Sequence, residues 1–126
     1  MKAIVVALLL APTLIQAHAQ APGFAAEYSL LDTHYKTYTL TNAYKFHAVF
    51  KVEVFNKEMQ PALGWQSKET EYQLKPNQSK KVKLKFNVDG QRKLLVCTTL
   101  TKIGKDHEKA SIISRICSRL IINDHR

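Results

Sequence analysis

The two cysteines, Cys97 and Cys117, have the clearest chemistry in this sequence. They are its only thiols and lie twenty positions apart, inside the stretch Arg92–Ile122. Both flanks of this stretch are rich in Val, Ile, Leu and Thr around a polar centre, which is typical of a β-hairpin. A turn near His107 places the cysteines directly opposite each other. Opposed residues have Cβ atoms about 4.5–5.5 Å apart, closer at non-hydrogen-bonded positions, and a disulfide needs about 3.5–4.5 Å. The sequence therefore predicts a Cys97–Cys117 disulfide.

This register also predicts which side chains share a face of the hairpin. Arg115 and Arg119 fall on the same face as the cysteines, so the disulfide is expected to be a cross-strand link near the surface. The last strand of a seven-strand sandwich is usually an edge, and an edge can pair with a strand of another protein. Arg115 and Arg119 are therefore predicted either to supply charge against unwanted pairing or to anchor an acidic partner, and the two roles are compatible.

The densest basic run lies in Lys80–Val88, where lysines alternate with apolar residues. A period of two predicts a strand with one buried face and one solvated face. A solvated face alone accounts for the lysines. The functional interpretation is a docking surface for an acidic partner, extended by Arg115 and Arg119. The predicted docking lysines are Lys81, Lys83 and Lys85.

Other reactive side chains do not form a recognisable site. The histidines after the leader are scattered without metal-ligand spacing, and the few glycines form no phosphate loop. Ser114 and Ser118 have no base nearby in the sequence. We therefore expect no catalytic residue, metal or cofactor, and a protein that is not an enzyme. A redox role would require an easily reduced disulfide, and a Cys-x-x-Cys motif is absent.

The first residues, Met1–Ala19, have the pattern of a secretory signal peptide. Lys2 is followed by an apolar run over Ala3–Ile15, too short to be a stable membrane anchor, and Ala17-His-Ala19 fits a cleavage site. We expect the mature chain to begin at Gln20 and to be located in the periplasm or secreted. An oxidising compartment favours a disulfide between the two cysteines, with a stabilisation of about 3 kcal/mol from loop entropy.

The charge balance suggests an anionic partner. The chain has 19 basic and 10 acidic side chains, a net charge of +9, and loss of Lys2 with the leader reduces this to +8. For an exported protein, anionic polysaccharide, lipopolysaccharide or acidic protein subunits are more accessible than nucleic acid. Net charge that only maintains solubility is the simpler explanation. One hypothesis is therefore a secreted polyanion- or carbohydrate-binding module that uses the basic β-face.

The rest of the chain predicts strands and no amphipathic helix. Apolar and polar residues alternate strongly over Phe46–Phe55, and the residues predicted to face the core are Phe46, Ala48, Phe50, Val52 and Val54. Near the start of the mature chain, Gln20–Ala26 is expected to be a loose lead and Glu27–Leu31 a short first strand. Six to eight short strands at intervals of about ten residues imply an antiparallel β-sandwich. The predicted organisation is a leader, 1–19, and one all-β domain of about seven strands, 20–126.

Several segments resemble a known family. Val52–Asn56, Trp65, Tyr72–Ser79 and the strand Val82–Phe86 resemble the amino-terminal immunoglobulin-like domain of PapD-like periplasmic pilus chaperones. The resemblance covers about half of the mature chain and implies an immunoglobulin-like sandwich. It also implies a chaperone that lends its last strand, here Ser111–Ile122, to an incomplete fibre subunit. The family's second domain and its paired Arg and Lys have no match in the sequence.

The leading hypothesis combines these observations. We expect an exported, non-enzymatic accessory or chaperone-like protein that assists assembly of a surface fibre, of pilus or curli type, by strand-edge binding. Its partner would be a fibre subunit or another acidic protein. Strand pairing should retain much of its affinity at high salt, whereas polyanion binding should weaken steeply.

Overall fold

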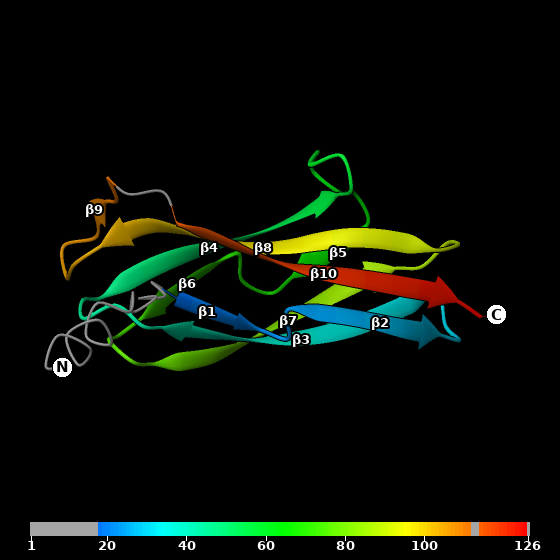
Figure 1. Cartoon of the computed structure of the whole chain (residues 1–126), viewed down its shortest axis with the longest axis horizontal. Coiled ribbons are helices and arrows are strands. Elements are labelled where there is room, and N and C mark those ends of the chain that lie inside the picture. Colours follow the sequence, from blue (N-terminus) through cyan, green and yellow to red (C-terminus); the bar gives the residue numbers. More distant parts are fainter. Residues whose placement is uncertain (1–17, 112–113, 126) are drawn as a thin grey trace, which may run out of the picture.

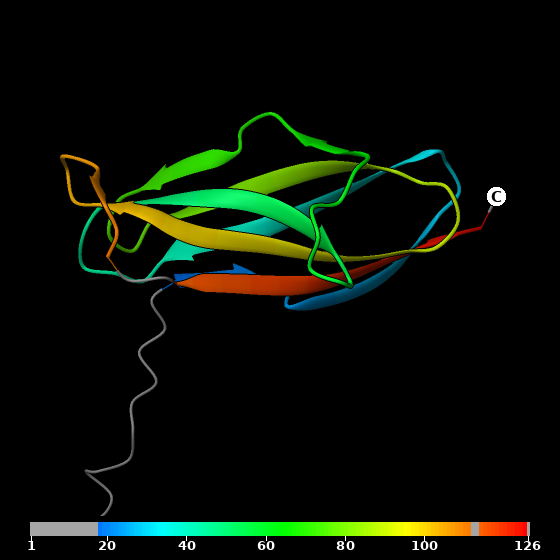
Figure 2. The same cartoon turned by 90° about the horizontal axis from the view of Figure 1, so that it is seen from above.

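The computed structural model describes residues 18–111 and 114–125. The predicted leader therefore lies outside the described residues, except for its last two. Figures 1 and 2 show two layers of strands packed face to face. Within the described ranges, no helix is long and apolar enough to cross a membrane. The structure is an immunoglobulin-like β-sandwich, which confirms the predicted fold class.

The strands divide between two sheets, and all pairs are antiparallel except β2 with β10. Sheet 1 contains, in spatial order, β1 (His18–Ala21), β3 (Thr33–Asn42), β7 (Ser79–Asn87) and β5 (Trp65–Ser67). Sheet 2 contains, in spatial order, β2 (Phe24–Ser29), β10 (Arg115–Asp124), β8 (Arg92–Ile103), β4 (Ala48–Asn56) and β6 (Glu71–Leu74), with β9 (Glu108–Lys109) beside β8.

The core lies between the sheets and follows the predicted alternation. In β4, the side chains predicted to face inward are buried from Ala48 onward, whereas Phe46 precedes the strand and is half-buried. In β7, the apolar face is buried, and Lys81, Lys83 and Lys85 lie on the opposite face. Burial of this apolar surface is the main favourable contribution to the sandwich. The core positions of these two strands are Ala48, Phe50, Val52, Val54, Val82, Leu84 and Phe86.

The start of the described chain differs from the prediction. Gln20–Ala26, expected to be a loose lead, contributes to two strands, and the expected first strand at Glu27–Leu31 is found earlier, as β2. The chain passes from sheet 1 to sheet 2 through a cis Ala21–Pro22 peptide bond. The prediction was wrong because the inward positions of β1 are polar. A pattern based on apolar alternation therefore does not detect this strand.

The hairpin formed by β8 and β10 has the predicted register. Cys97 lies directly opposite Cys117, and the two form a disulfide with a Cα–Cα distance of 4.0 Å. The link is on the outer face of sheet 2, as expected. The disulfide is less exposed than expected. Cys97 is fully buried, because β4 lies on the far side of β8, whereas Cys117 is partly exposed.

The last strand is only partly an edge. Residues 119–124 of β10 pair in parallel with β2, so this part of the strand has a neighbour on both sides. Residues 115–118 pair with β8 on one side, and no strand of the described chain forms a ladder on the other side. The predicted edge is therefore restricted to the first part of β10, because the segment that covers the remainder was not expected to be a strand.

Candidate functional site

The candidate site is this unpaired part of β10, Arg115–Ser118, which we term the open half of β10. β1 and β2 lie one after the other alongside β10, as Figure 1 shows in blue. Only β2 belongs to the same sheet as β10, and β1 pairs with β3 of sheet 1. The crossing of the chain between the sheets therefore leaves the open half without a second strand that pairs with it.

The open half directs backbone groups away from β8. Opposed antiparallel residues with a short Cα–Cα distance are non-hydrogen-bonded pairs, and the value of 4.0 Å places Cys97 and Cys117 in this class. The pairs containing Arg115 and Arg119 lie two residues away on either side and belong to the same class. Consistent with this, the Arg119 N–H donates outward to the carbonyl of Gly23, at 3.0 Å. The N–H and C=O groups of Arg115 and Cys117 are therefore directed toward the open side.

Gln20 of β1 closes the interior beneath the open half. Its Nε2 donates to the Val96 carbonyl at 2.8 Å and to Ser118 Oγ at 2.7 Å, and its Oε1 accepts from Thr98 Oγ1 at 2.7 Å. All three side chains are buried. Buried polar groups require such partners, so these side-chain hydrogen bonds connect the edge of sheet 1 to sheet 2 where no ladder connects them.

His18 extends the same connection. Its Nε2 lies 3.2 Å from the Thr98 carbonyl, its Nδ1 lies 3.3 Å from Ser114 Oγ, and its ring centroid is 4.6 Å from that of Phe50. Burial lowers the pKa of His18, against the opposing effect of the Thr98 carbonyl. A neutral imidazole fits both contacts, with Nε2–H donating and Nδ1 accepting. We term His18, Gln20, Thr98 and Ser118 the β1 polar network.

The β1 polar network was missed by the sequence analysis. His18 falls inside the predicted cleavage motif and Gln20 inside the expected loose lead. A polar side chain gives no sign in the sequence that it will be buried. The Thr98 partner of His18 is 80 positions away, and the Val96 partner of Gln20 is 76 positions away. The contacts between distant segments that satisfy these groups become visible only once the sandwich is assembled.

The two arginines predicted to contact a partner have different surroundings. Arg115 Nε donates to Thr99 Oγ1 at 3.1 Å, and its guanidinium lies 3.9 Å from Glu53 and 5.3 Å from the Phe55 ring centroid. Arg119 is exposed, and the described residues provide it with no ion pair. Both are on the outer face of sheet 2, but only Arg119 has a charge without an internal partner.

The predicted docking lysines lie elsewhere. β7 is in sheet 1, so its outward side chains are on the opposite face of the sandwich from Arg115 and Arg119. The predicted combined surface does not form. Lys83 Nζ lies 4.8 Å from the ring centroid of Tyr35, in a shallow groove of about 380 Å³. Lys81, Lys83 and Lys85 therefore form a separate basic row on the outer face of sheet 1.

Charged groups between the sheets hold β2 in position. The carboxylate of Glu27 contacts His34 at 2.7 Å and Lys36 at 2.6 Å, both from β3. Partial burial raises the pKa of Glu27, but hydrogen bonds and positive charge from Lys36 and His34 outweigh this effect and lower it. The hydroxyl of nearby Tyr38 is buried and has no hydrogen-bond partner among the described residues. This cluster secures the strand that covers the second half of β10.

No group suited to holding a metal ion appears in residues 18–111 and 114–125. Such a group would need at least three His, Cys, Asp or Glu side chains close together. The expected lack of catalytic residues and cofactors remains a prediction. The backbone groups of the open half can form hydrogen bonds with an added strand.

Solved structures share this fold. The periplasmic chaperone SfaE aligns with a TM-score of 0.67 at 8% identity, over 86% of this chain and 58% of its own. A chain from the complex of Salmonella enterica SafA pilin with the SafB chaperone aligns with a TM-score of 0.69 at 12% identity, over 90% of this chain and 57% of its own. The fold is PapD-like. This confirms the fold that the resemblance implied.

The PapD-like fold also occurs outside pilus chaperones. A C. elegans member of the MSP family aligns with a TM-score of 0.66 at 12% identity, over 85% of this chain and 98% of its own. No family model matches the sequence, and no curated protein matches it. The chain spans a little over half the length of the chaperone chains it matches. At these identities, the likeness establishes the fold alone.

Proposed function

We propose that this PapD-like domain is an exported, non-enzymatic chaperone-like protein that assists assembly of a surface fibre by binding a strand of a fibre subunit. The observation that carries the proposal is the open half of β10, an unpaired edge that a disulfide holds against β8 and that the β1 polar network supports from beneath. Similarity to periplasmic chaperones, one of them solved with a pilin, supports a subunit as the partner and the periplasm as the location.

The proposed contact is a strand added beside β10. The outward N–H and C=O groups of Arg115 and Cys117 would form its first hydrogen bonds, because main-chain pairing supplies affinity in this mode of recognition. The disulfide holds this short edge against β8 and so reduces the ordering cost of binding. A pilus-type or a curli-type subunit fits this contact equally.

Arg115→Pro tests the proposal. Arg115 is the first residue of β10 and its N–H is directed away from β8, so proline removes an edge donor without removing a β8 hydrogen bond. We expect purified candidate subunits to bind the wild type and to lose about tenfold or more in affinity for this variant. Arg115→Ala, which retains the N–H but lacks the guanidinium, is the matched control and should lose less. Circular dichroism and thermal unfolding verify that both variants fold.

A salt titration separates this proposal from the polyanion-binding alternative, which would use Lys81, Lys83 and Lys85. Strand pairing should survive a rise from about 0.1 to 1 M salt, over which charge interactions are largely screened. Affinity that disappears at high salt, or equal affinity of Arg115→Pro and Arg115→Ala, would contradict binding through the strand edge.

A further inference from the structure

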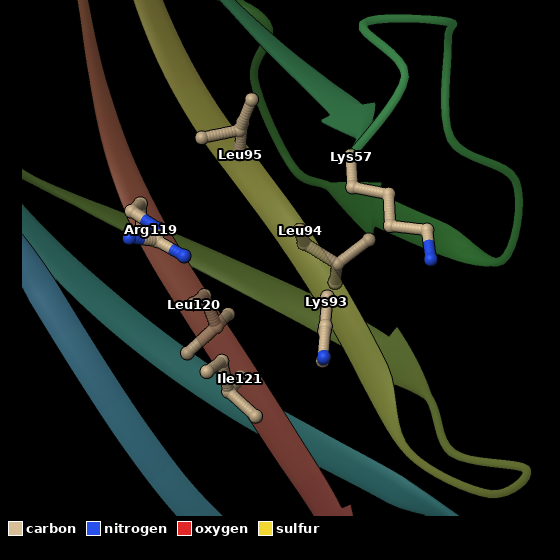
Figure 3. Close-up of a pocket in the computed structure, with 7 residues that line it drawn as sticks. All are labelled: Lys57, Lys93, Leu94, Leu95, Arg119, Leu120 and Ile121. Carbon is tan, nitrogen blue, oxygen red and sulfur yellow. The ribbon is translucent and has the colours of Figure 1, made fainter.

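A shallow groove of about 320 Å³ lies on the outer face of sheet 2, over the β8–β10 pair (Figure 3). It is close to the open half of β10 but separate from it, since it is formed on a sheet face rather than along a strand edge. The lining residues are Lys57, Lys93, Leu94, Leu95, Arg119, Leu120 and Ile121.

The outward side chains of the groove form a two-by-two pattern. Arg119 is opposite Leu95, and two residues further along Lys93 is opposite Ile121. Leu95 and Ile121 therefore lie on one diagonal, with Arg119 and Lys93 at the other two corners. Lys57 adds a third cation from the turn after β4, across β8 from β10 (Figure 3). The groove thus has an apolar centre with positive charge on both sides.

Two of these cations have no ion-pair partner among the described residues, and the third has only an exposed one. Lys93 and Arg119 are exposed and form no ion pair with any described residue. Lys57 lies 3.9 Å from Glu58, but both side chains are more than half exposed, and such pairs contribute little. Arg115 on the same face differs, because Glu53 already lies beside it. The groove therefore favours a ligand that brings negative charge.

We propose that this groove binds an acidic segment of a protein partner that has an apolar side chain between its carboxylates. The carboxylates would contact Arg119 on one side and Lys93 and Lys57 on the other, and the apolar side chain would cover Leu95 and Ile121. A lipid has its charge at one end of its apolar part, which fits less well with cations on both sides. The disulfide lies next to the Leu95–Arg119 pair and makes the base of the groove rigid before binding.

The test uses a synthetic ten-residue peptide, Glu-Ser-Leu-Ser-Glu repeated twice, labelled for fluorescence anisotropy. Alternate side chains of an extended segment lie on one face, so Glu, Leu and Glu face the groove together. Arg119→Gln with Lys93→Gln should weaken its binding about tenfold or more. The matched control, Lys81→Gln with Lys83→Gln, removes the same charge from sheet 1 and should change affinity by no more than about twofold. Leu95→Gln should also weaken binding, because it places a polar group at the apolar centre.

Three results would overturn the proposal. Equal losses in the two double variants would indicate general attraction to a basic protein. Unchanged binding of a peptide with Gln in place of Glu would exclude recognition of carboxylates. Binding to phosphatidylglycerol vesicles without binding to the peptide would assign the groove to a membrane surface. Subunit binding that is lost in Arg115→Pro but retained in the Arg119 and Lys93 double variant would show that the two sites are distinct.

Discussion

The two halves of β10 share one neighbouring strand, β8, and differ in the other. Residues 119–124 also pair with β2, whereas residues 115–118 face β1, which belongs to the opposite sheet. The second half is therefore held by two ladders, and the first by one ladder, a disulfide and side-chain hydrogen bonds. The comparison shows how a sandwich can retain a usable edge. One segment is divided between two sheets, and polar side chains close the interior where the ladder is missing.

Removal of the disulfide should have the largest effect on this comparison. We expect Cys97→Ala with Cys117→Ala to lower the free energy of unfolding by about 3 kcal/mol, measured by urea denaturation. Hydrogen exchange should accelerate more in residues 115–118 than in 119–124, since only the latter have β2 as a second neighbour. Reduced wild-type protein is the control. Equal acceleration in both halves would show that the disulfide does not act locally.

Loss of Gln20 should have the next largest effect. Gln20→Ala leaves the hydroxyls of Thr98 and Ser118 buried without the hydrogen bonds shown by the structure, at a cost of about 1–3 kcal/mol. Gln66→Ala removes the same type of side chain at an exposed position of β5 and should cost less than about 0.5 kcal/mol. If denaturant curves gave the two variants the same stability, the β1 polar network would not hold the open half.

A smaller effect should appear as a pH dependence in a chain that retains His18. Burial lowers the pKa of His18, so below its ordinary value of 6.5 the unfolded state takes up the proton first. The stability of the fold with a neutral, buried His18 is therefore full above pH 6.5 and decreases as the pH falls toward the pKa of His18 in the folded state. Unfolding at a series of pH values should show a slope that His18→Gln reduces. An identical slope in both proteins would assign the pH dependence to other groups.

The smallest effect should come from the covered half. Glu27 has a lowered pKa because Lys36 and His34 outweigh its desolvation, so its contribution is present above pH 4.5 and is lost as the pH falls through the pKa of the folded state. Its side chain is 31% exposed, which screens the pair. We therefore expect Glu27→Gln to cost only about 0.5 kcal/mol at neutral pH. Glu58→Gln, in an exposed pair, should produce no measurable change by the same denaturation assay.

The sequence predicted well wherever apolar alternation or a local turn decides the structure. The strands β4 and β7 follow from a period of two. The register of β8 and β10 follows from a turn midway between Cys97 and Cys117, because one fixed pair determines all the others. The turn and strand pattern between Val52 and Phe86 was sufficient for the resemblance to the PapD-like fold.

The candidate site depends on information that alternation does not contain. Alternation assigns a side chain to one face of its strand but does not say in which sheet the strand lies. The lysines of β7 and the arginines of β10 were therefore expected on one surface and occur on opposite ones. The open half was equally hidden, because it arises where the chain changes sheets between Ala21 and Phe24, and the buried residues before that point, His18 and Gln20, are polar.

The position of His18 links removal of the leader to the shape of the proposed edge. Processing between Ala19 and Gln20, the predicted bond, would take the imidazole away from Phe50 and leave empty volume beneath residues 115–118. It would also create an α-ammonium group on Gln20, a positive charge beside an edge whose interior contacts are otherwise neutral. Signal peptidase would then change the interior that supports the proposed subunit-binding edge, and the mature chain and its precursor would differ beneath that edge. Mass analysis of the exported chain decides this, since a mature terminus at or before His18 would rule it out.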